Sequence, residues 1–425
     1  MKEKKAINPY TALTWLCWLV YSSAYVGKLS YAANISQVIA YYKVSHADAG
    51  VVSTCLFFAY AVGQFVNGVF NKRYNIRLVV TVSLALSCAV NLVLAITDYF
   101  PVVKYLWIVN GFAQSVLWPT LIRLLAECLP EKSMSYASVI MGAASPVGTV
   151  VIYAVSALYV KINFKLAFYT AAILLPIVIL IWVCTSGVLM KKAKENGAME
   201  DGEKMEENAA QRIPAAPVSV KTKQKIPFDL MLTIIFLAVF AVGVNLIADG
   251  LTTWVPSILK ESFGFDDSLS IILTVALPLI TVFSNFFAVM LHKKMPDFIH
   301  KSALLFAITG GLILLIIGMF SLKQAIVTIV CFALVRGLLG CVNSLVNGVF
   351  PLFMKEKINS GMIAGVLNGF CYVGSTASSY GLGLVADHHG WTAVFWLLFA
   401  VCVLVCVMWV GYVIVKSVYK KKKAD

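Results

Sequence analysis

A lysine, Lys28, lies inside an apolar run near the N-terminus, and two tyrosines precede it on the same helix face. Tyr21, Tyr25 and Lys28 follow one another at intervals of four and three residues, which is the spacing of neighbours on one side of an α-helix. A charge inside a membrane-spanning helix is expensive and by default faces a polar interior or a partner. We therefore expect Lys28 to bind a substrate with both phenols beside it. The alternative is that Lys28 lies near the outer end of its helix and extends its ammonium group to the lipid headgroups.

A second cation, Arg336, lies well inside the apolar run 324–350. Asn343 and Asn347 follow it on the same helix face. Arginine stays protonated when buried and can hold a carboxylate or a phosphate through two parallel hydrogen bonds. We expect these three side chains to bind an anionic substrate. The alternative is that Arg336 forms a structural ion pair.

One carboxylate, Asp249, lies within an apolar run of the second half of the chain and away from its ends. Asn245 and Thr252 share its helix face. Three roles are open for Asp249. It can pair with Lys28 or Arg336 until an anionic substrate displaces it, it can carry a proton because burial disfavours an ionised carboxylate, or it can face solvent at a helix end.

Two further stripes of polar side chains occur at helical spacing. They are Asn368, Tyr372, Ser375 and Ser379 in one run, and Tyr60, Gln64 and Asn67 in another. Such groups can hydrogen-bond a polar substrate, or they can hold neighbouring helices together within a membrane. Of these we expect Asn368 and Tyr372 to contact the substrate.

These residues need helices that cross a membrane, and the composition supplies them. Of 425 residues, 60% are hydrophobic and 13% are charged. Apolar runs of spanning length recur from end to end and do not alternate as barrel strands do. The pattern predicts an all-α polytopic membrane protein with twelve transmembrane helices. They lie near 10–36, 46–70, 76–97, 102–128, 133–159, 163–190, 227–258, 267–292, 300–320, 324–353, 357–386 and 391–417.

One long hydrophilic segment divides these helices into two sets of six. We expect an N-terminal six-helix bundle over 1–190, a cytoplasmic linker over 191–226 and a C-terminal six-helix bundle over 227–425. Short basic turns, NKRYNIR and HKKMPDFIH, follow the second helix of each set. This correspondence predicts two pseudo-symmetric bundles.

The net charge of +14 is not spread as a nucleic-acid-binding surface would require. Lys and Arg cluster in alternate loops, which predicts that both termini are cytoplasmic. The 10 cysteines show no metal-binding spacing, and no nucleotide-binding loop or nucleophile motif occurs. We expect no metal, no cofactor and no enzymatic activity.

Three stretches resemble the major facilitator superfamily. Within it they resemble the organophosphate:phosphate antiporter branch, the relatives of glycerol-3-phosphate and hexose-phosphate transporters. The stretches are GVFNKRYNIR (68–77), GFAQSVLWPTLIR (111–123) and AGVLNGFCYVGSTASSYGLGLVADHHGW (364–391). The resemblance adds Gln114 and Trp118 to the expected substrate-binding residues. It also suggests that Arg73 and Arg77 belong to a gate.

Arg123 and Glu127, one turn apart near the cytoplasmic end of their helix, are expected to pair and to complete that inner gate.

This sequence differs from the branch at the residues that bind phosphate in the branch. The branch places one arginine on the first helix and another on the seventh. This chain has Lys28 at the first position and Ala248, followed by Asp249, at the second. A substrate-site histidine of the fifth helix is also missing from GAASPVG. We expect Arg336 to supply the lost cation.

These patterns predict a secondary active transporter of a small organic anion, either a phosphate ester or a sugar acid. It would work by alternating access, through exchange for a counter-anion or through proton symport. The alternatives are a proton-coupled exporter of drugs or metabolites and a non-transporting membrane sensor. We expect a monomer in the lipid bilayer of the plasma membrane, which is the cell inner membrane of a bacterium.

Overall fold

The computed structural model describes residues 8–70, 74–210, 228–295, 297–350 and 360–424, and within these ranges the regular structure is helical, without strands. Nine helices in the described part of the chain are long and apolar enough to cross a membrane. The predicted all-α, polytopic architecture is therefore confirmed.

The described helices fall into two halves of the chain. The first half contains α1 (Pro9–Ala33), α2 (Ile35–Tyr42), α3 (His46–Phe70), α4 (Ile76–Ile96), α5 (Phe100–Ser115), α6 (Leu117–Cys128), α7 (Glu131–Tyr159) and α8 (Leu166–Ala210). The second half contains α9 (Phe228–Phe263), α10 (Asp267–Thr274), α11 (Ala276–Lys294), α12 (Phe298–Ser321), α13 (Ala325–Ser344), the π-helix η2 (Leu345–Val349) and α15 (Ser360–Ala424).

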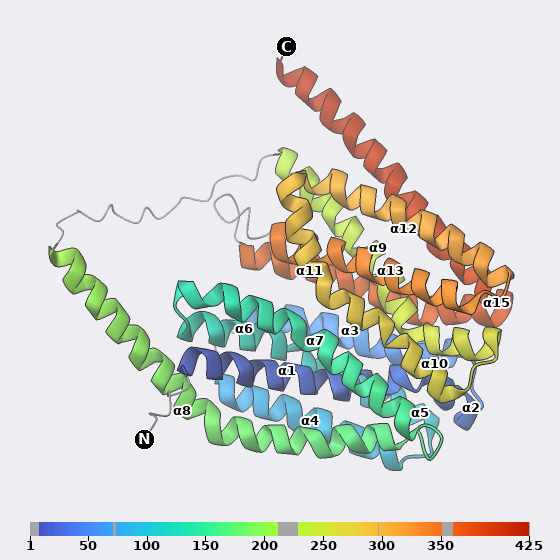
Figure 1. The fold of residues 1–425 in the computed structure, drawn as a ribbon, viewed down its shortest axis with the longest axis horizontal. Helices are drawn as coiled ribbons and strands as arrows, with labels where there is room; N and C mark the ends of the chain where they lie inside the picture. The colour runs from blue at the N-terminus through green and yellow to red at the C-terminus, as the bar shows by residue number, and fades with distance from the viewer. Residues whose placement is uncertain (1–7, 71–73, 211–227, 296, 351–359, 425) are drawn as a thin grey trace.

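Twelve crossings result when the interrupted helices are joined. Within the described residues, the pairs α1 and α2, α5 and α6, α10 and α11, and α13 and η2 each make one crossing. Helix α15 makes two, which meet at Gly390, where φ is 73°. Figure 1 shows the helices of the two halves as two neighbouring layers that run roughly along the same direction.

Helix α8 continues beyond the expected end of the first bundle. We predicted a helix end at residue 190, whereas α8 runs to Ala210. The added segment is rich in Ala, Glu, Lys and Met, which favour helix, and Lys191 faces Glu195 one turn on, at 3.8 Å. The start of the predicted linker is therefore helical.

Glycines allow several helices to touch through their backbones. A Cβ atom at Gly148 of α7 would lie 2.2 Å from the carbonyl oxygen of Ser22 in α1. One at Gly374 of α15 would lie 2.1 Å from the carbonyl oxygen of Val242 in α9. No side chain fits at such distances, so these helices pack as closely as small residues permit.

The molecule has two ends, which we name by the residues found there. The His46 side carries the N-terminus of α3 and the connections at 160–165, 264–266 and 387–391. The termini side carries the start of α1 and the end of α15. Figure 1 shows the start of α1 and the long extension of α8 at this second end.

Candidate functional site

The Lys28 ammonium group lies among aromatic rings from both halves of the chain. Its Nζ atom is 3.9 Å from the ring centre of Tyr60, 5.0 Å from that of Tyr25 and 5.5 Å from that of Tyr372. Lys28 is 4% exposed. Rings at these distances attract a cation through their electron-rich faces. Tyr372 comes from α15, so the second half contributes to the surroundings of a first-half lysine.

Asp249 faces the same region from α9. Its Oδ2 atom accepts hydrogen bonds from Ser375 Oγ at 2.5 Å and from Asn245 Nδ2 at 3.3 Å. Asp249 lies within electrostatic range of both Lys28 and Arg336. The predicted face of α9 and the predicted face of α15 are thus brought together.

We call the group formed by Tyr25, Lys28, Tyr60, Asp249, Arg336 and Tyr372 the central cluster. Arg336 of α13 also lies within electrostatic range of Tyr25 and Tyr153 from the first half. Among the described residues, neither Lys28 nor Arg336 forms a hydrogen bond or an ion pair with the protein. Two buried or half-buried cations that lack hydrogen bonds and ion pairs are costly in a folded protein, and an anionic ligand would supply these contacts.

Other predicted substrate residues lie around this cluster. The Tyr21 ring contacts Trp118 at 4.8 Å between ring centres and Tyr25 at 5.2 Å. Asn347 donates to Asn343 Oδ1 at 2.7 Å and to the Cys371 sulfur at 3.1 Å. The two asparagines therefore tie α13 and η2 to α15. Asn368 is half-buried on α15, four residues before Tyr372.

Gln114 lies in a buried polar network inside the first half. Its Nε2 atom donates to Ser87 Oγ at 2.8 Å and to Asn110 Oδ1 at 3.0 Å. The carbonyl oxygen of Gly27, beside Lys28, accepts from Asn110 Nδ2 at 3.1 Å and from Asn91 Nδ2 at 3.0 Å. The network thus holds α1 one residue from Lys28. Asn91 and Asn110 were not among the residues predicted from the sequence to belong to the site.

We predict that Asn110→Ala weakens substrate binding although Asn110 itself does not contact the substrate. The change removes one donor from the Gly27 carbonyl and one acceptor from Gln114, which costs about 1–3 kcal/mol for an unsatisfied buried group. We expect a lower Tm and a KM for uptake raised by about tenfold. Thr170→Val, which removes a hydroxyl bonded only to the Leu166 carbonyl of its own helix, is the control. An unchanged KM for Asn110→Ala would mean that the network does not position Lys28.

The predicted gating residues lie on the termini side. Arg123 Nε donates to Glu127 Oε1 at 2.6 Å, so this pair forms as expected. Arg77 Nε donates to Ser186 Oγ at 3.1 Å and binds α4 to α8 within the first half. Arg73 lies outside the described residues. Their role in a gate stays a prediction.

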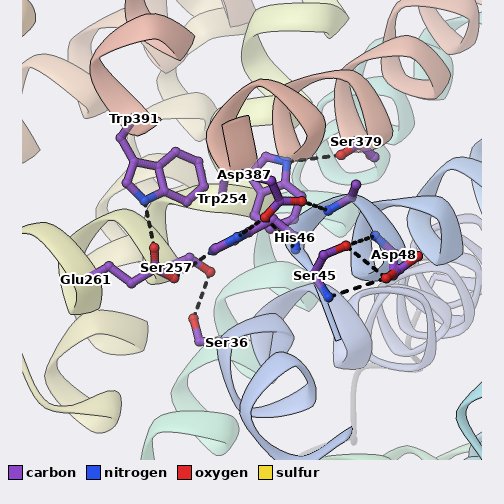
Figure 2. A network of polar contacts seen from close by, with 11 residues as sticks. Ser36, Ser45, His46, Asp48, Trp254, Ser257, Glu261, Ser379, Asp387 and Trp391 are labelled. Carbon is purple, nitrogen blue, oxygen red and sulfur yellow. Dashed lines mark hydrogen bonds and ion pairs between the residues drawn. The ribbon is translucent and has the colours of Figure 1, made fainter. Parts of the chain in front are cut away.

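The two halves are joined by polar contacts at the His46 side, which Figure 2 shows. His46 Nε2 lies 2.8 Å from Glu261 Oε1 of α9, and His46 Nδ1 lies 2.6 Å from Asp387 Oδ1 of α15. Asp387 also accepts from the backbone amides of His46 at 3.0 Å and Ala47 at 2.7 Å. A carboxylate of the second half therefore caps the N-terminus of a first-half helix.

Further contacts between the halves continue from this side toward the middle. Ser36 Oγ lies 2.9 Å from Ser257 Oγ, and Tyr153 donates to the Thr252 carbonyl at 2.8 Å. Lys161 pairs with Asp266 at 3.3 Å. The amide of Leu269 donates to Asp266 and lowers the pKa of that exposed carboxyl, so it stays ionised opposite Lys161. The structure is thus closed at the His46 side.

A separate apolar hollow lies between α12 and α15, lined by residues such as Phe306, Gly310, Phe399 and Val407. Val407 is 61% exposed in a helix that crosses the membrane. A hollow of this character suits lipid chains, so an anion would not bind there.

The family model of the Major Facilitator Superfamily matches residues 17–379. Sugar phosphate exchanger 3 of Xenopus laevis is 27% identical over 197 residues, which are 45% of this chain and 38% of that protein. Membrane sensor protein UhpC of Escherichia coli is 28% identical over 25% of this chain and 25% of its own length. These matches thus span less than half of each relative. They confirm the resemblance to the organophosphate:phosphate antiporter branch.

A solved structure shows the same fold over nearly the whole chain. It is that of a bacterial homologue of the human lysosomal transporter Spinster, in an inward-facing and occupied conformation. It is 13% identical and superposes with a TM-score of 0.70 over 97% of this chain and 98% of that one. Sequence and fold therefore agree, and the chain belongs to the Major Facilitator Superfamily.

Proposed function

We propose that the protein is a secondary active transporter that carries a small organic anion, a phosphate ester or a sugar acid, across the plasma membrane. The observation that carries the proposal is a pair of cations, Lys28 from the first half and Arg336 from the second, on a cluster that both halves build. Within the described residues neither cation forms a hydrogen bond or an ion pair with the protein. An anion between them would contact both halves at once. The family membership and the sugar phosphate exchangers among the relatives support this reading.

Transport then follows if the protein alternates between a state closed at the His46 side and a state closed at the termini side. The contacts at the His46 side hold the halves together there, so the central cluster would be reached from the termini side, which the basic loops suggest is cytoplasmic. The anion, by bridging Lys28 and Arg336, lowers the energy of the intermediate in which neither end is open. Breaking the His46 contacts and closing the opposite end would release it on the other side.

The charge of the cluster bears on which anions would fit. Lys28 and Arg336 carry two positive charges and Asp249 one negative charge, so the excess is one positive charge when all three are ionised. A monoanion such as a sugar acid would neutralise it directly. A doubly charged phosphate ester would fit better with Asp249 protonated. Counter-anion exchange and proton symport are therefore both compatible with this cluster.

Uptake into proteoliposomes tests the proposal. Vesicles loaded with phosphate or with buffer alone are offered labelled phosphate esters and sugar acids, with and without an inward proton gradient. Uptake that needs internal phosphate would identify an exchanger, whereas uptake driven by the proton gradient would identify a symporter. Vesicles without protein give the background. No uptake of any anion above that background would contradict the proposal.

A non-transporting sensor is the second candidate, because a membrane sensor protein is among the relatives. It would bind an anion at the same cluster without moving it. Binding can be followed by the rise in Tm with added ligand. One result would favour the sensor over the transporter. A ligand would raise the Tm of the wild type but not that of the Lys28→Met variant, and the same ligand would not enter the vesicles.

A further inference from the structure

The His46 imidazole lies between two carboxylates that both belong to the other half of the protein. Its Nε2 atom faces Glu261 Oε1 at 2.8 Å, and its Nδ1 atom faces Asp387 Oδ1 at 2.6 Å. Trp254 and Trp391 flank the ring, with centres 5.6 and 5.3 Å away. Trp391 in turn donates to the second oxygen of Glu261 at 2.8 Å. Figure 2 shows the ring enclosed by these groups.

Only the protonated ring can make both contacts as hydrogen bonds. A neutral imidazole has one N–H donor and one lone pair, whereas the imidazolium has two donors. In the neutral form one nitrogen lone pair would face a carboxylate oxygen at less than 3 Å.

The proton belongs on His46 and not on either carboxylate. Asp387 already accepts from the amides of His46 and Ala47 at the start of α3, which favours its ionised form. Glu261 accepts from the Trp391 indole. The charged groups that face the ring are Glu261 from α9 and Asp387 from α15. On its own helix, Asp48 is engaged by Ser45.

We propose that His46 is a proton-binding site that locks the His46 side closed when it is protonated and frees it to open when it is neutral. The side chain is 19% exposed, so protons from the adjacent water can reach it. When the halves separate at this side, His46 moves away from both carboxylates, and the contacts that stabilise its protonated form are lost. Closing therefore takes up one proton and opening releases one.

The proposal rests on the proposed transport function only for its consequence in the cycle. If the His46 side faces outward, acid outside would slow the return of the site to the outside. The ratio of closed to open molecules would rise by at most about tenfold for each pH unit of acidification, as for a single linked proton. The change would fall between about pH 5 and pH 8, where histidine titrates.

Distances between spin labels measure this equilibrium without any substrate. Ile162, 76% exposed in the first half, and Leu322, 65% exposed in the second, both lie at the His46 side. Each is replaced by a labelled cysteine in the full chain, from which the reactive native cysteines have been removed. We expect one short distance at about pH 5 and a growing long-distance population toward about pH 8.

Three variants separate the proposed cause from general pH effects. His46→Gln, which is neutral, should show the same distances at both pH values. His46→Arg, which stays charged and can donate to both carboxylates, should stay short at both. His388→Gln changes an exposed histidine of the same end and should behave as the wild type. A pH-independent wild type, or a pH response that survives in His46→Gln, would overturn the proposal whether or not the protein transports.

Discussion

Uptake of the anionic substrate is expected to fall to background when Lys28 is replaced with methionine. Methionine keeps most of the apolar stem that packs against Tyr60 and Tyr25 but removes the charge. Loss of a desolvated cation opposite a bound anion is typically worth about 2–5 kcal/mol. This corresponds to a fall in kcat/KM of about 30-fold or more. Initial uptake rates in proteoliposomes, at matched protein content, measure the effect.

Arg336→Leu is expected to act on the same step from the other half. Because one anion would bridge both cations, the double variant should be little worse than either single one. Lys28→Arg, which restores the charge, should recover part of the uptake. Lys323→Met is the control, since Lys323 donates only to the Ser262 carbonyl within the second half. Normal uptake by Lys28→Met, with normal thermal stability, would place the anion site elsewhere.

The helices were predictable because apolar runs of spanning length leave few other structures in a membrane. The interruptions inside single crossings were not predicted. The breaks at Val116 and Val275 each lie three residues before a proline, Pro119 or Pro278, and a proline disrupts the helical hydrogen bonding of the turn before it. The π-helix at 345–349 lies within an apolar run. The predicted end of α8 at residue 190 was wrong, because α8 runs to Ala210. The segment after residue 190 is polar, which suggests a linker, but its residues favour helix.

The residues of the central cluster were predictable one helix at a time. The period of the helix places Tyr25 with Lys28, and Asn245 with Asp249, on one face. It does not say which face meets which. That Ser375 would donate to Asp249, or that Tyr372 would reach Lys28 from the other half, depends on how two bundles pack.

Gln114 illustrates the same limit for a single side chain. Its position on the fourth crossing matches the pattern of the antiporter branch, which predicts contact with the substrate. In the structure its side-chain amide group donates instead to Ser87 and Asn110 of the first half. The closure around His46 escaped the sequence analysis for a related reason. His46, Glu261 and Asp387 lie at helix ends far apart in the chain, where charged residues are ordinary. Only the packing of the halves turns them into one group.

The strongest test of the closure is a single methyl group at Gly50. A Cβ atom there, in α3, would lie 2.3 Å from the carbonyl oxygen of Ser379 in α15. The two backbones belong to different halves, so Gly50→Ala should leave each half folded and oppose only their contact at the His46 side. Overpacking of this kind costs about 1–3 kcal/mol, which shifts the ratio of open to closed molecules by about 5- to 150-fold.

Two glycine variants show whether the effect belongs to the contact between halves. Gly381→Ala lies on the same helix as Ser379 and meets nothing within 4 Å, so it should resemble the wild type. Gly111→Ala would place a Cβ atom 2.3 Å from the carbonyl oxygen of Leu56. Both residues belong to the first half, so this variant should lose thermal stability. Gly50→Ala should instead keep its stability, slow uptake and lengthen the label distance between residues 162 and 322.

Gly50→Ala and His46→Arg should oppose each other when combined, because one methyl group favours the open end and one fixed charge favours the closed end. The two residues act on the same rigid-body movement but not on the same atoms, so their effects on the ratio of open to closed molecules should add approximately. If the long-distance population of the double variant lies between those of the two single variants, both residues act on that movement. If Gly50→Ala left the distances unchanged, the approach of α3 to α15 would not be the contact that closes this side.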